Sequence, residues 1–189
     1  MPPRFLDEWR AERRLRRNAT LYAQALQTEP DEEDVSWLAA LGTGGDRDRA
    51  RWELRYARRA LGLMSAQRDA LDDQTASAVA REISSALSHD RHVGAGMTRV
   101  AERQFNARLR AYVEAASVRG GEALTERLGR ALLVAAGATP PTDPGALARA
   151  SEIVGRYMAE GNDVLRDVFG VASLPEHIAP SAAHEGAKR

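Results

Sequence analysis

The sequence predicts an all-α protein, a single-domain helical bundle of about six helices with a short disordered C-terminal tail. Apolar residues recur three and four positions apart along most of the chain, which is the spacing of one face of an α-helix. No stretch shows the alternation of a half-buried strand, and β-branched residues are sparse. No internal repeat at a fixed period is found, so we expect one non-repetitive body.

The chain divides into three predicted regions. Residues 1–29 should form a basic amphipathic helix, residues 30–170 the core of the bundle, and residues 171–189 an irregular tail. The helix itself is expected over residues 5–27, where an apolar stripe is interrupted by Glu12 and by arginines at positions 13, 14, 16 and 17. A helix whose apolar stripe is interrupted in this way either packs on its own bundle or binds a partner protein.

The stretch from residue 46 to residue 71 is predicted to be the central helix. Its apolar side chains cover an arc of roughly 200°, too wide for a helix that lies on a surface. They are Trp52, Leu54, Tyr56, Ala57, Ala60, Leu61, Leu63 and Met64. The remaining face carries arginines at positions 47, 51, 55 and 58, so we expect a nearly surrounded helix with one guanidinium-lined edge.

The other helices are expected at residues 35–41, 74–88, 97–118, 122–136 and 145–169. Pro30 and the acidic run that follows it are typical of a helix N-terminus. Asp46 and Asp143 are predicted N-caps, the second followed by proline in the first helical turn. Glycine- or proline-rich connections are predicted at residues 42–45, 120–121 and 137–145.

Composition limits the functional classes. The chain has 27 basic and 27 acidic residues, so its net charge of zero gives no overall attraction to nucleic acid or anionic membrane. The absence of cysteine excludes disulfides, thiolate zinc sites and a cysteine nucleophile. The N-terminus lacks the apolar segment of a secretory signal, and we expect a cytoplasmic location. All but one of the basic residues are arginine, as in proteins of GC-rich bacterial genomes.

No motif for a hydrolase nucleophile, a phosphate-binding loop, a dinucleotide fold or a zinc protease occurs in the sequence. His89 and His92 have a spacing that could hold a metal if Asp90 or Glu102 supplied a third ligand. Two loop histidines without a fixed third ligand are more often solvated. We therefore expect no catalytic residue, no metal and no cofactor.

Paired aspartates provide one alternative. Asp69 and Asp73 form a D-x-x-x-D motif in one region, and Asp163 and Asp167 form a second on another helix. Two such pairs facing each other could hold Mg²⁺ against a diphosphate. The pattern resembles the isoprenoid synthases of the head-to-head type, which are also all-helical, and the resemblance is confined to these two five-residue motifs. Helix capping and a solvated helix face explain the same aspartates.

Arginine rows and the N-terminal helix are the predicted partner-binding features. Exposed arginines at this spacing are most often a solvated face or intrahelical ion pairs, and less often contact an acidic partner or phosphates. The N-terminal helix carries a net charge of +4 over residues 9–17 and is of the kind that contacts an anionic membrane surface or a partner's groove. The predicted partner-binding residues are Trp9, Arg13, Arg17, Arg47, Arg51, Arg55, Arg58, Arg99, Arg103 and Arg110.

The sequence therefore favours a non-catalytic α-helical module, an accessory or adaptor subunit that binds a protein partner or self-associates. Arginine and aromatic residues of the kind enriched at interfaces are its positive evidence. Two alternatives remain open at this point. One is a small enzyme or ligand-binding protein that handles a diphosphate and metal through the paired aspartates, and the other is a nucleic-acid-binding regulator that uses the arginine rows.

Overall fold

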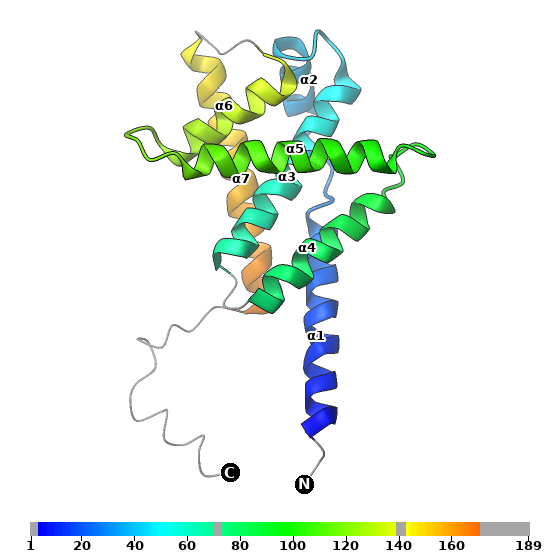
Figure 1. Ribbon diagram of the computed structural model, residues 1–189. Coiled ribbons are helices and arrows are strands. Elements are labelled where there is room, and N and C mark those ends of the chain that lie inside the picture. The colour runs from blue at the N-terminus through cyan, green and yellow to red at the C-terminus, as the bar shows by residue number, and fades with distance from the viewer. Residues whose placement is uncertain (1–3, 70–72, 139–142, 171–189) are drawn as a thin grey trace.

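The computed structural model describes residues 4–69, 73–138 and 143–170, which form seven helices and no strand (Figure 1). The predicted all-α class is confirmed, with one helix more than the expected number. The predicted tail, residues 171–189, lies outside the described residues. The helices are α1 (Arg4–Ala25), α2 (Glu32–Leu41), α3 (Arg47–Asp69), α4 (Asp73–Ser88), α5 (Thr98–Ser117), α6 (Leu124–Ala136) and α7 (Pro144–Phe169).

Helix α3 is central, as its wide apolar arc predicts. It packs against α2, α4, α5, α6 and α7, and α5 crosses it on the front of the body in Figure 1. The apolar residues on both predicted arcs are buried, except that Trp52 and Met64 are half-buried. A helix surrounded on so many sides contributes most of its apolar area to the core, which is the main source of its stability.

A close approach at Gly62 joins α3 to α1 and α7. A Cβ atom at this position would lie 2.5 Å from both Cδ atoms of Leu26. The Tyr22 hydroxyl donates a hydrogen bond of 2.8 Å to the Gly62 carbonyl, and the Gly62 Cα lies 3.5 Å from the Cβ position of Gly161. A side chain at position 62 would therefore force the Leu26 side chain to shift, because α3 lies close to its neighbours at this point.

The helix starts follow the predicted capping residues. The Asp31 carboxylate accepts a hydrogen bond from the Glu33 amide, and that of Asp143 accepts one from the Gly145 amide. Asp46 accepts from the Arg49 amide at 2.9 Å. These bonds pair backbone donors that have no partner within the first helical turn.

The two halves of α1 differ in their surroundings. Ala19, Tyr22, Ala23 and Leu26, at and just beyond its C-terminal half, are buried against the body. Residues 7–14 are all exposed, and Figure 1 shows this dark-blue end of α1 extending away from the other helices. We call residues 7–17 the α1 projection. None of the described helices combines the length and the apolar character needed to cross a membrane.

Candidate functional site

The arginines of α3 that the sequence places on one edge are each bonded to a carboxylate from another segment. Arg47 and Arg51 share Glu32, one oxygen each, at 2.6 Å. Arg55 bonds to both oxygens of Glu29 at 2.8 and 2.7 Å. Arg58 bonds to Glu160 of α7 at 2.6 Å. We call Arg47, Arg51, Arg55 and Arg58 the α3 row.

The inner half of the α3 row is not the open edge that the sequence predicts. The side chains of Arg55 and Arg58 are only 7% and 11% exposed. The Arg58 guanidinium also lies over the Tyr157 ring, 4.2 Å from its centroid, a favourable contact between a cation and an aromatic face. The physical reason is that α7 and the connection after α1 cover this edge and bring the acidic partners with them.

Two further pairs of this kind were missed from the sequence. Arg59 bonds to Asp90 at 2.5 Å, and both side chains are almost fully buried. Arg108 of α5 makes a two-point contact of 2.6 Å to each oxygen of Glu53. A signal for Arg59 exists, because it continues the four-residue spacing of the α3 row, whereas nothing local marks Asp90 as its partner.

The arginines of α5 are arranged differently. Arg99, Arg103 and Arg110, which we call the α5 row, are exposed, and none has a carboxylate at ion-pair distance within the described ranges. The Nε atoms of Arg103 and Arg110 donate only to backbone carbonyls of their own helix, at 3.4 and 3.3 Å. This row is therefore a solvated face in the isolated chain.

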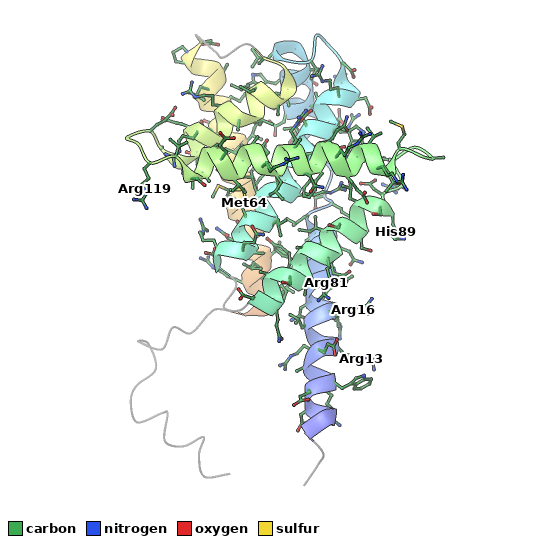
Figure 2. The ribbon with its side chains drawn as sticks, viewed as in Figure 1. Arg13, Arg16, Met64, Arg81, His89 and Arg119 are labelled. Carbon is green, nitrogen blue, oxygen red and sulfur yellow. The ribbon has the colours of Figure 1, made fainter. Side chains whose placement is uncertain are left out.

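The α1 projection combines an aromatic side chain with open arginines. Trp9 is 47% exposed, and the Arg13 guanidinium lies 4.6 Å from its ring centroid. Arg13 and Arg17 have no acidic partner in the part of the chain that the structure describes, while Arg16 lies 3.9 Å from Glu82 of α4. Figure 2 shows Arg13 and Arg16 on α1 below Arg81 of α4.

The paired aspartates show no shared metal arrangement. Asp69 is bonded to both Nε and Nη2 of its neighbour Arg68, at 2.8 Å. Asp163 lies 3.8 Å from Arg166 and is largely exposed. Among the described residues no group of three histidine, aspartate or glutamate side chains is placed to hold a metal ion, and residues 70–72, inside the first motif, lie outside this description.

A polar cavity of about 320 Å³ lies where the connection after α1 and the connection after α4 meet α3. Asp90 organises it by accepting hydrogen bonds from Arg59, from the His92 amide at 2.9 Å and from the His92 ring, whose Nδ1 lies 3.0 Å away. Its lining consists of Gln27, Glu29, Arg55, Arg59, His89, Asp90, Arg91 and His92.

Burial and hydrogen bonding shift the pKa values of several titratable groups in the core. Burial opposes ionisation of Asp90, yet the hydrogen bonds from Arg59 and the His92 amide outweigh it and hold the pKa of Asp90 below its usual value. Burial raises the pKa of Tyr56 to about 12 and raises the pKa of Tyr112 and Tyr157 as well. These phenols therefore stay neutral at physiological pH.

Comparison with known proteins adds no family to this description, because no family model, curated protein or solved structure matches the chain.

Proposed function

We propose that the protein is a non-catalytic binding module that docks the acidic surface of another protein through the α1 projection. The observation that carries the proposal is the contrast within α1: residues 7–14 are all exposed, whereas Ala19, Tyr22 and Ala23 are buried. Residues 7–14 contribute little to the core, and a helical end with so little packing is marginal in water, so a partner that covers it would stabilise it. Helices α4 and α7 pack against α1 and hold its inner half.

The side chains of the projection suit a protein surface. Trp9 and the Arg13 guanidinium above its ring belong to residue types that are enriched at the energetic centres of protein interfaces. Asp7, Glu8 and Glu12 lie among the arginines, so the projection has a mixed charge and not the uniformly basic face that is typical of binding to a nucleic-acid backbone. Within residues 7–17 the large apolar side chains are Trp9 and the half-buried Leu15, which is fewer than burial of this segment in a lipid surface requires.

Charge also argues for a different protein rather than a second copy. The acidic run at residues 29–34 is the densest in the chain. Most of its carboxylates already form ion pairs with arginines of the same chain. Glu29 and Glu32 bind the α3 row, Glu33 binds Arg149, and Asp34 binds Arg156. Within the described residues a second copy would therefore offer this run with four of its five carboxylates already paired.

Photo-cross-linking in the native cell tests the proposal. A photoreactive residue at Ala11, which is exposed on the projection, should give a cross-linked protein of defined mass, whereas the same residue at the exposed Ala148 of α7 should not. The double substitution Arg13→Glu and Arg17→Glu should abolish the product, and Arg103→Glu with Arg110→Glu is the matched control of equal charge change. Equal loss in both variants, or a product containing nucleic acid, contradicts the proposal.

Once the partner is identified, the substitution Trp9→Ala measures the contribution of the tryptophan ring to the binding free energy. We expect a loss of about 2 kcal/mol or more in binding free energy, as for a central interface tryptophan. Folding should be unaffected because the ring is not part of the core. Calorimetric titration of the two purified proteins gives the value, and unchanged affinity would show that the projection is not at the interface centre.

A further inference from the structure

We infer that the polar cavity between the two connections is a binding site for a small oxyanion of the size of phosphate. This site is separate from the α1 projection, and its function does not depend on the proposed protein partner. It combines two buried arginines from α3 with histidines and an arginine from the connection after α4.

The side chains that line the cavity offer more hydrogen-bond donors than acceptors. Both oxygens of Glu29 accept from Arg55, and the two oxygens of Asp90 accept from Arg59 and from His92. Donors are left over. Within the described residues Arg55 bonds to Glu29 through Nη2 alone and Arg91 has no acceptor, whereas the unpaired Nε and Nη1 atoms of Arg59 have almost no accessible surface and do not face the cavity. The N–H groups of Arg55 and Arg91 without an acceptor favour an added one.

The lining of the cavity also has a net positive charge. The lining contains three arginines and two carboxylates, an excess of one positive charge with both histidines neutral. A cation would add to that excess, and the carboxylates that could ligate it are engaged by guanidinium groups. An oxyanion removes the excess and accepts several N–H bonds at once, which is the recognition chemistry of arginine clusters.

The buried arginines of the cavity are held in place by their ion-pair partners. Arg55 and Arg59 are 7% and 3% exposed and are held in place by their carboxylate partners, so they are oriented before any ligand arrives. The Nδ1 atom of His89 lies 2.8 Å from the Ser85 carbonyl, a contact in which Nδ1 donates. His92 lies between Asp90 and Glu29, with Nε2 3.6 Å from a Glu29 oxygen. Groups fixed in this way lose little conformational freedom on binding.

The test uses inorganic phosphate and sulfate as probes of the intact chain. Titration at low ionic strength, followed by the NMR resonances of the His89 and His92 rings, should show saturable shifts in the millimolar range or below. A titration with acetate distinguishes a general carboxylate site from one that requires a tetrahedral anion. Linear shifts without saturation would mean that anions act only through ionic strength, and would overturn the inference.

Arg91→Gln provides the decisive variant, because Arg91 is exposed and its loss should not impair folding. It should weaken phosphate binding about tenfold, the effect of one charge-assisted hydrogen bond. Arg103→Gln removes the same charge outside the cavity and should leave the affinity unchanged. Equal weakening by both variants would show diffuse electrostatic attraction rather than a site. Failure of this experiment leaves the cross-linking result at Ala11 untouched, and the reverse also holds.

Discussion

The α3 row and the α5 row contain arginines at the same helical spacing, yet their surroundings are opposite. The first and last members of each row are eleven residues apart, Arg47 to Arg58 and Arg99 to Arg110. Every arginine of the α3 row bonds to a carboxylate, and its inner half is buried. The α5 row is exposed, and within the described ranges it has no such partner.

The difference arises from residues far away in the sequence. The partners of the α3 row are Glu29, Glu32 and Glu160, which lie 15 to 102 positions from the arginines they bind. Acidic residues within the same helices do not decide the outcome. Glu53 of α3 turns inward to Arg108, and Glu102 of α5 accepts a hydrogen bond from the Ser88 hydroxyl. A row of arginines is therefore structural or open according to what the tertiary fold places opposite it.

The largest effect is expected at the most buried of the α3 ion pairs. Asp90→Ala should lower the free energy of unfolding by about 3 kcal/mol, because it leaves the Arg59 charge buried without its partner. The double variant Arg59→Met with Asp90→Leu should recover part of this loss, since replacing both charges by apolar groups removes the desolvation cost. Urea unfolding of the three proteins measures these values. A double variant less stable than Asp90→Ala would contradict the explanation.

A smaller difference should separate the two rows directly. Arg58→Met should destabilise the fold by about 1 to 2 kcal/mol, because it removes a hydrogen bond to Glu160 and the contact with the Tyr157 ring. Arg103→Met, its counterpart in the α5 row, should change stability by less than about 0.5 kcal/mol, as for an exposed side chain without partners. The same unfolding measurement applies to both. Similar losses would mean that the α5 row has a structural role.

Acid should weaken the buried pair in a defined direction. The pKa of Asp90 is lowered in the folded state, so the unfolded chain binds the proton first as the pH falls. The stability that Asp90 contributes is complete above its unfolded pKa of about 4 and is lost as the pH falls through the lower folded value. Unfolding curves of the wild type and of Asp90→Asn should therefore converge below about pH 4. A constant difference down to the most acid conditions would argue against an ionised Asp90 in the native state.

The fold was largely predictable, and the ion-pair network was not. The width of the apolar arc around Trp52 and Leu61 predicts a surrounded helix, and Asp143 before Pro144 predicts a helix start, because both signals are local. The burial of Arg58 depends on where α7 lies, and the position of Asp90 opposite Arg59 depends on the path of the connection after α4. Periodicity along one helix contains no information on either.

The smallest predicted effect concerns the outer end of the α3 row, where Arg47 and Arg51 share Glu32. The hydrogen bonds from these two arginines hold the pKa of Glu32 below its usual value, but the Glu32 side chain is 62% exposed and so is open to water and salt. Glu32→Gln should shift the unfolding midpoint far less than Asp90→Ala, and the shift should vanish at high salt. The loss at Asp90 should persist in sodium chloride, because both side chains of that pair are almost fully buried and a buried pair is screened only weakly. Equal salt sensitivity at the two positions would remove the distinction between the outer and inner pairs of α3, and with it the reason for treating the buried arginines as structural.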